Sequence, residues 1–230
     1  MHARTALLHI LHAALLLALL PGAAPPAAAE ARQAATPSAT AAAAAEDAAG
    51  ESRGIGGRYL LMDANGRAVS NEDFPGQFQL IAFGYTFCPD VCPTTLAEMS
   101  VIMEQLGATA ERVQPLFITV DPERDTAAVL RGYTEFFHPR IMGLTGSPDL
   151  VRRAADSFKV RYEKVREPGA PPEQYAVDHS AGIFLLGPDG RYIRKFAYAT
   201  PPAEIAKRIG EIVAVGEAGP LPRHLRPRQP

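Results

Sequence analysis

The alternation of short apolar runs with helical stripes limits the fold of this chain more than any other feature. The run Gln79–Tyr85 is rich in β-forming residues and too short for a buried helix, so it predicts a buried strand. The next segment, Thr94–Leu106, carries apolar residues at the spacing of an amphipathic helix: Leu96, Met99, Met103 and Leu106. Val113–Val120 then predicts a second buried strand. A strand, a helix and a strand in this order indicate an α/β domain with parallel central strands.

The same alternation continues on both sides of this unit. Before it, Tyr59–Met62 predicts a strand that enters a turn at Asn65-Gly66. After it we predict a helix from the N-cap Thr126 to Phe137, with Val129, Leu130, Tyr133 and Phe137 on one side, and a strand at Ile141–Leu144. A helix at Pro148–Phe158, capped by Ser147, and an extended segment at Val160–Val165 follow. The last predicted elements are a hairpin of Gly182–Leu186 with Tyr192–Tyr198 and a helix at Ala203–Val215. The predicted fold class is therefore α/β, with a central mixed sheet flanked by helices and a β-hairpin and helix at the C-terminal end.

The two ends of the chain differ in composition from this domain. Arg4 and the apolar run after it, closed by Ala27-Ala28-Ala29, resemble a signal peptide over residues 1–29, although a retained N-terminal anchor is the alternative. Residues 30–53 are rich in Ala and lack large apolar side chains, so they predict a disordered linker. We therefore expect export to the periplasmic side of the inner membrane, one domain at 54–216, and a flexible tail at 217–230.

The charge balance argues against one class of partner. The formal net charge is −2 and the sequence pI is about 6.3. Nucleic-acid-binding domains usually carry a basic stripe or patch, whereas the one basic cluster here lies in the short C-terminal tail. We therefore expect no nucleic acid as a partner.

The chain has two cysteines, and their positions indicate chemistry. Cys88 directly follows the strand predicted at Gln79–Tyr85, and Cys92 lies where the next helix begins. Ligands of open α/β sheets bind at the carboxyl ends of the strands, and a helix N-terminus stabilises a thiolate. The C-x-x-x-C spacing places both sulfurs on one helical face, where they can form a disulfide or hold one soft metal ion. Thiolates favour Cu(I), with zinc as the main competitor.

A third ligand would come from the six histidines. His2, His9, His12 and His224 lie in the predicted terminal segments, and His138 lies at a helix end. His179, just before the strand Gly182–Leu186, is predicted to lie in a loop that faces the same strand ends as the cysteines. The neighbouring Asp178 is a candidate to support it, and Asp90 has either a turn-forming or an electrostatic role.

Four segments together resemble one known family. Gly84–Pro93 (GYTFCPDVCP) is similar to the signature of the Sco/SenC copper chaperones, and three more matches follow in order: Val120–Thr126, Phe137–Arg140 with Gly143–Gly146, and Asp178–Ser180. The resemblance covers roughly residues 57–200 and implies a thioredoxin-like fold. It implies a copper ion, Cu(I) or Cu(II), as the bound metal, with Cys88, Cys92 and His179 as its ligands.

The resemblance also implies a function and a partner. The function is delivery of copper to the dinuclear copper site of cytochrome c oxidase, or reduction of the cysteines of that site. The partner is then the copper-receiving subunit of the oxidase, with a thiol reductant protein as a further candidate. The alternative function is an enzyme, a thiol–disulfide oxidoreductase that uses Cys88 and Cys92 as its redox pair without metal. Its usual motif is C-x-x-C, from which this chain departs by one residue.

Overall fold

The computed structural model describes residues 54–218. The predicted signal peptide or anchor, the predicted linker and the part of the predicted tail after Ala218 therefore lie outside the described residues. No helix within the described part is long and apolar enough to cross a membrane. The strands are β1 (Leu60–Met62), β2 (Ala68–Ser70), β3 (Phe78–Gly84), β4 (Val113–Thr119), β5 (Met142–Leu144), β6 (Tyr162–Val165), β7 (Ala176–His179), β8 (Ile183–Leu186) and β9 (Tyr192–Phe196). The helices are α2 (Val91–Leu106), α3 (Ala127–Phe137), α4 (Pro148–Phe158), α5 (Pro202–Ala218) and the short 3₁₀ helix η1 (Gly107–Arg112).

A five-stranded mixed sheet in the order β5-β4-β3-β8-β9 forms the centre of the domain. β3, β4 and β5 are parallel, whereas β8 is antiparallel to both β3 and β9. All seven residues of β3 are buried, because this strand has neighbours on both edges and helices on both faces. Two two-stranded antiparallel ribbons, β1-β2 and β6-β7, complete the fold.

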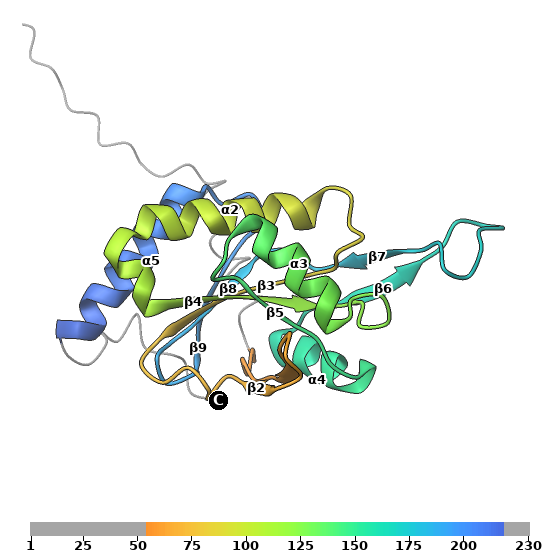
Figure 1. Cartoon of the computed structure of the whole chain (residues 1–230). Helices are drawn as coiled ribbons and strands as arrows, with labels where there is room; N and C mark the ends of the chain where they lie inside the picture. Colours follow the sequence, from red (N-terminus) through yellow and green to blue (C-terminus); the bar gives the residue numbers. More distant parts are fainter. Residues whose placement is uncertain (1–53, 219–230) are drawn as a thin grey trace, which may run out of the picture. The chain divides into compact units, whose positions relative to one another are not determined.

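Helices cover both faces of the sheet. The crossovers β3-α2-β4 and β4-α3-β5 place α2 and α3 on one face, where α5 packs against α2 (Figure 1). α4 lies on the opposite face with the β1-β2 ribbon (Figure 1). There Phe158 of α4 packs against Phe83 of β3 and Phe184 of β8, with ring centroids 5.2 Å away in both cases. The core therefore has two layers, one on each side of the sheet.

The helix starts follow from capping residues in the sequence. The Thr126 side chain accepts a hydrogen bond from the Val129 N–H, and the Ser147 side chain accepts one from the Leu150 N–H. Pro148 occupies the first turn of α4, where its missing N–H leaves no helical bond unmade. Both caps are at the predicted positions, and all four predicted apolar residues of α2 are buried.

The predicted α/β class, the mixed sheet and the C-terminal hairpin and helix are confirmed. Three details differ from prediction. Val129 is 41% exposed, so it lies outside the buried face of α3. α5 continues to Ala218, two residues beyond the predicted end of the domain. The strand β7 was not predicted, because Ala176–His179 alternates buried and exposed residues over only four positions.

Candidate metal centre

The loop between β3 and α2 brings the two cysteines to the carboxyl end of a central strand. Its path depends on Gly84, the last residue of β3. A Cβ atom at Gly84 would lie 2.7 Å from the Cys92 Sγ and 2.8 Å from Cε2 of Phe117. Such distances are far below van der Waals contact, so the absence of a side chain at Gly84 lets the Cys92 sulfur approach the strand.

The two thiols occupy different environments. Both are free, with Cys88 partly exposed and Cys92 buried. The Cys92 Sγ lies 3.5 Å from the backbone N of Tyr85, and the backbone N of Cys92 lies 3.5 Å from the Cys88 Sγ. Cys88 therefore lies beside Cys92, but in the loop before α2 begins at Val91, so the two sulfurs do not share one helical face as the C-x-x-x-C spacing predicted.

These environments move the two thiol pKa values in opposite directions. Partial burial raises the pKa of Cys88, but hydrogen bonds from the backbone of Asp90, Cys92 and Val91 and from the Cys92 thiol favour its thiolate and give a net lowering. Burial raises the pKa of Cys92, and the hydrogen bond from the Tyr85 N–H offsets this only in part. Cys88 is thus the thiol poised to ionise first.

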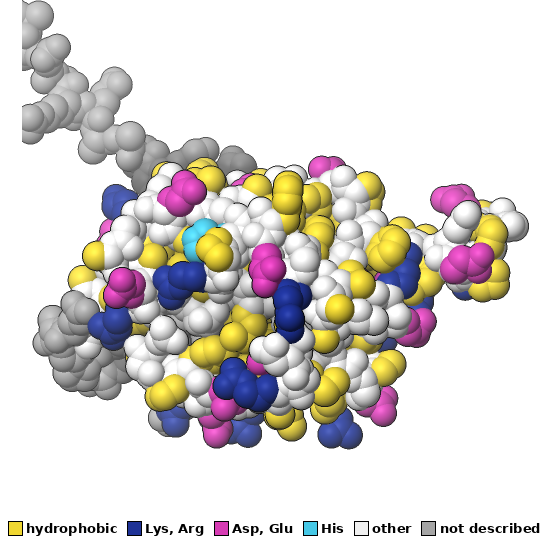
Figure 2. All heavy atoms as spheres, in the orientation of Figure 1, with side chains coloured by type: hydrophobic (Ala, Val, Ile, Leu, Met, Phe, Trp, Pro, Cys, Tyr) yellow, Lys and Arg dark blue, Asp and Glu magenta, His cyan; other side chains and the backbone are white. Residues whose placement is uncertain are grey.

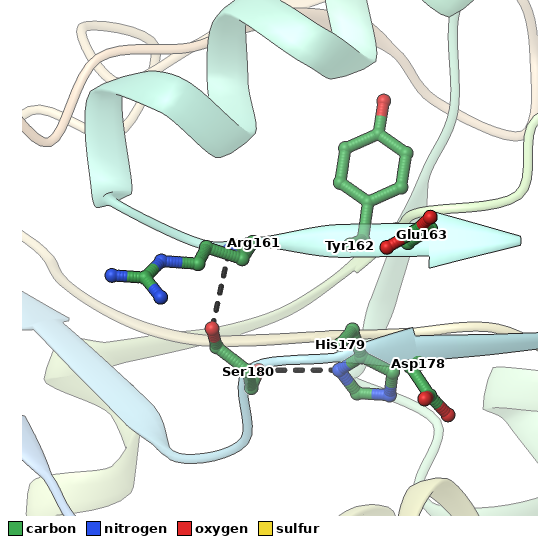
Figure 3. Close-up of a pocket in the computed structure, with 6 residues that line it drawn as sticks. All are labelled: Arg161, Tyr162, Glu163, Asp178, His179 and Ser180. Atoms are coloured by element: carbon green, nitrogen blue, oxygen red, sulfur yellow. Dashed lines mark hydrogen bonds between the residues drawn. The ribbon is translucent and has the colours of Figure 1, made fainter.

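His179 reaches the cysteines from the end of β7, where Tyr162 of β6 is its partner in the ribbon. Its Nε2 lies 3.4 Å from the Cys92 Sγ. Its Nδ1 lies 3.2 Å from the Ser180 carbonyl oxygen, which can only accept, so Nδ1 carries the hydrogen and Nε2 offers its lone pair (Figure 3). The position before β8 was predicted correctly, but the loop assigned to His179 is the end of a strand.

The surroundings of His179 favour a neutral ring. Burial lowers the pKa of His179, while the Ser180 hydrogen bond and the Asp178 carboxylate raise it by less. His179 is also one of the residues that line an open hollow of about 380 Å³, where the start of β6 lies beside the end of β7 (Figure 3). Neutral imidazole is the form that binds metals, so the electrostatics suit a ligand.

The contacts among the three predicted ligands are pairwise. Cys88 contacts Cys92, and Cys92 contacts His179. Within residues 54–218 no three His, Cys, Asp or Glu side chains stand close enough together to enclose a metal ion as they are. A metal held by all three would therefore require the side chains to converge further.

The other candidate residues lie outside this contact set. His138 caps the C-terminal end of α3 and accepts a hydrogen bond from the Arg140 N–H through its Nδ1. Asp90 is the N-cap of α2 but makes no capping hydrogen bond with its side chain. Asp178 is exposed beside His179 and acts on it through its charge. The remaining histidines of the sequence lie outside the described residues.

Sequence reasoning missed a group of polar residues behind the cysteine loop. Asp121, Asp125 and Thr119 are fully buried at the end of β4. Arg124 pairs with Asp121, and its guanidinium lies 3.7 Å from the centroid of the Tyr175 ring. The only signal in the sequence is that Asp121, Arg124 and Asp125 belong to Val120–Thr126, one of the segments that resemble the family.

A mixed sheet of this order, with a cysteine pair at the junction of a central strand and its helix, defines a thioredoxin-like protein with a candidate soft-metal centre. The chain belongs to the SCO1/SenC family, whose model matches residues 47–214. The SCO2-like protein of Rickettsia felis is 40% identical over 151 residues, which are 66% of this chain and 73% of that protein.

Solved structures agree with this assignment. The structure of Bradyrhizobium japonicum ScoI with copper bound is similar with a TM-score of 0.62 and 40% identity, over 68% of this chain and 98% of that chain. BsSco is similar with a TM-score of 0.53 and 26% identity, over 69% of this chain and 92% of that chain. BsSco is described as a member of the Sco family of cytochrome c oxidase assembly proteins with a disulfide switch.

Proposed function

We propose that this chain is a copper-binding metallochaperone that holds copper through Cys88, Cys92 and His179. The observation that carries the proposal is the contact between the unprotonated Nε2 of His179 and the Cys92 Sγ, next to the Cys88 thiol. Two thiolates and one imidazole form a soft donor set that suits Cu(I), which is content with fewer ligands than zinc. The copper bound in the ScoI structure supports this choice of metal.

The recipient in this proposal is the dinuclear copper site of cytochrome c oxidase. Support comes from BsSco, which is placed among the assembly proteins of that oxidase. Copper would leave by ligand exchange with the cysteines of the copper-receiving subunit. A partly exposed Cys88 is the ligand that such a partner can reach first.

A titration of the reduced full chain with Cu(I) and a competing chelator tests the metal site. We expect one copper per chain, and we expect His179→Ala to weaken binding at least tenfold because one ligand is lost. His138→Ala is the matched control, since His138 lies at the end of α3 and should leave the affinity unchanged. Two equally tight sites, no binding, or equal affinity of His179→Ala and wild type would each refute the proposal.

The pKa difference between the thiols favours a second function, thiol–disulfide exchange. Cys88 is accessible and its pKa is lowered, whereas Cys92 is buried and its pKa is raised. This pairing suits an attacking thiol and a resolving thiol. In this reading the chain reduces the cysteines of the oxidase copper site and is itself reduced by a thiol reductant protein. Reduction of a disulfide-bonded peptide of that site by metal-free protein tests it, and an inactive wild type contradicts it.

We also propose that residues 1–29 direct export to the periplasmic side of the inner membrane. The apolar run and the Ala-rich site after it support this proposal. Cleavage after Ala29 would release the domain on its linker, whereas a retained run would anchor it. Mass spectrometry of protein recovered from the periplasm tests cleavage, because an intact Met1 would favour the anchored form.

A further inference from the structure

The carboxyl group of Asp125 is completely buried behind the loop that carries Cys88. It lies 3.1 Å from the backbone N of Thr86, 2.6 Å from the Thr86 Oγ1 and 2.7 Å from the Thr119 Oγ1. The adjacent Arg124 directs its Nε to Asp121 instead. Burial of a carboxyl group is costly unless its oxygens are hydrogen-bonded, and here three donors supply those bonds.

The directions of two of these hydrogen bonds follow from the groups that make them. The Thr119 hydroxyl already accepts a hydrogen bond from the Asp121 N–H at 2.9 Å, so it can donate its own hydrogen to Asp125. The Thr86 N–H can only donate. Asp125 therefore accepts one hydrogen bond from the backbone N–H of Thr86, in the loop after β3, and one from Thr119, the last residue of β4.

The residues on either side of Thr86 make the backbone contacts of the two cysteines. Thr86 stands two residues before Cys88, whose N–H donates to the Tyr85 carbonyl at 3.3 Å. The N–H of the same Tyr85 points at the Cys92 Sγ. The hydrogen bonds between Thr86 and Asp125 therefore connect the segment Tyr85–Cys88 to the rest of the domain.

We propose that Asp125 is a positioning residue that holds Thr86 and thereby fixes Cys88 next to Cys92. The inference rests on the proposed function only in taking these two cysteines as the reactive pair. An asparagine at this position would place an N–H group where one carboxyl oxygen now accepts, so the Thr86 N–H or the hydroxyl hydrogen of Thr119 would lose its acceptor. The loop would then sample positions in which the sulfurs are farther apart.

The test measures the equilibrium of the Cys88–Cys92 disulfide with glutathione in metal-free full chain. In this reaction two glutathione thiols reduce the protein disulfide to two thiols and leave as oxidised glutathione. For Asp125→Asn and for Thr86→Val we expect the equilibrium constant for disulfide formation to fall about tenfold, about 30 mV toward a more positive potential. The double variant should show no larger change than the stronger single variant, because both changes break the same connection.

Two further variants separate positioning from simple destabilisation. Thr86→Ser keeps the hydroxyl and should retain the wild-type potential. Thr145→Val removes the hydrogen bond from the Thr145 Oγ1 to the backbone carbonyl of Asp125, 2.9 Å long and equally buried, but leaves the carboxyl contacts in place. It should lower the melting temperature without moving the potential.

The proposal is overturned if Asp125→Asn and Thr86→Val keep the wild-type potential, or if their effects simply add. Should Asp125→Asn not fold, the comparison of Thr86→Val with Thr86→Ser decides, since an equal potential in both rejects the role. Copper is absent from this measurement. If the protein bound no Cu(I), the chaperone proposal would be refuted, but the measured disulfide potentials would still test the role of Asp125.

Discussion

Gly84 shows how strongly one residue determines the candidate centre. Any side chain at this position would overlap the Cys92 sulfur and the Phe117 ring. Because the neighbours are a sulfur in a helix and a buried aromatic ring, neither can move away cheaply. The position of the buried thiol therefore depends on a residue that takes no part in binding.

We predict that Gly84→Ala destabilises the domain by about 1–3 kcal/mol, the usual cost of overpacking a core. Chemical denaturation of the reduced protein measures it. Gly132→Ala is the control, because a Cβ atom at Gly132 on α3 meets nothing within 4 Å. There alanine should stabilise the helix by about 0.5–1 kcal/mol. A Gly84→Ala variant as stable as wild type would contradict the close approach of the Cys92 sulfur and the Phe117 ring to Gly84.

The sequence was informative about which residues form the candidate centre and silent about what supports them. Cys88, Cys92 and His179 could be selected because their residue types are rare and chemically distinctive. Asp125 and Thr86 could not, because their role depends on a contact between segments 39 positions apart, made by common residue types. Contacts of that range depend on how the strands pair, which local patterns do not encode.

Among the elements, the ribbons were harder to predict than the central strands. β3 and β4 are short, mostly apolar runs, which length and composition identify. The β6-β7 ribbon has mostly exposed residues and projects from the domain (Figure 1), so its strands carry little apolar pattern. On the face drawn in Figure 2, acidic and basic side chains are interspersed on and around it.

The β1-β2 ribbon depends on a buried carboxylate at its turn. Asp63 accepts hydrogen bonds from the N–H groups of Asn65 and Arg67 and from the Arg67 guanidinium. Burial raises the pKa of Asp63, but these hydrogen bonds and the nearby positive charge lower it more, so the net shift is downward. The folded state therefore favours the ionised form.

This shift predicts how the ribbon responds to acid. A lowered folded-state pKa contributes stability that is fully present above the unfolded pKa, about 3.9, and is lost as the pH falls through the folded value. We expect Asp63→Asn to be less stable than wild type at neutral pH and the two to converge in acid. Denaturation between pH 7 and pH 2 measures this, with Glu173→Gln on the exposed β6-β7 turn as the control. If wild type were still more stable than Asp63→Asn at pH 2, the lowered pKa of Asp63 would not be the source of the difference in stability.

At the scale of the whole molecule, the cysteine pair lies at the border of the hydrophobic core. The core is formed by the five-stranded sheet and the helices on its faces, and it includes Cys92 but only borders Cys88. A disulfide between them would close a loop of only about five residues, and short loops give the least stabilisation, less than the roughly 3 kcal/mol of a 15-residue loop. Oxidation should therefore change the chemistry far more than the fold.

We predict that the oxidised protein stays folded and binds no Cu(I). Both sulfurs must be thiolates to hold the metal, and a disulfide removes both at once, so the redox state would control loading. Thermal unfolding and Cu(I) titration of the oxidised and reduced forms test this, with Cys88→Ser as the variant that cannot form the bridge. Equal Cu(I) affinity of the two forms would mean that the cysteines are not the ligands. If oxidation unfolded the domain, the pair could not act as a reversible switch, and copper loading would need another control.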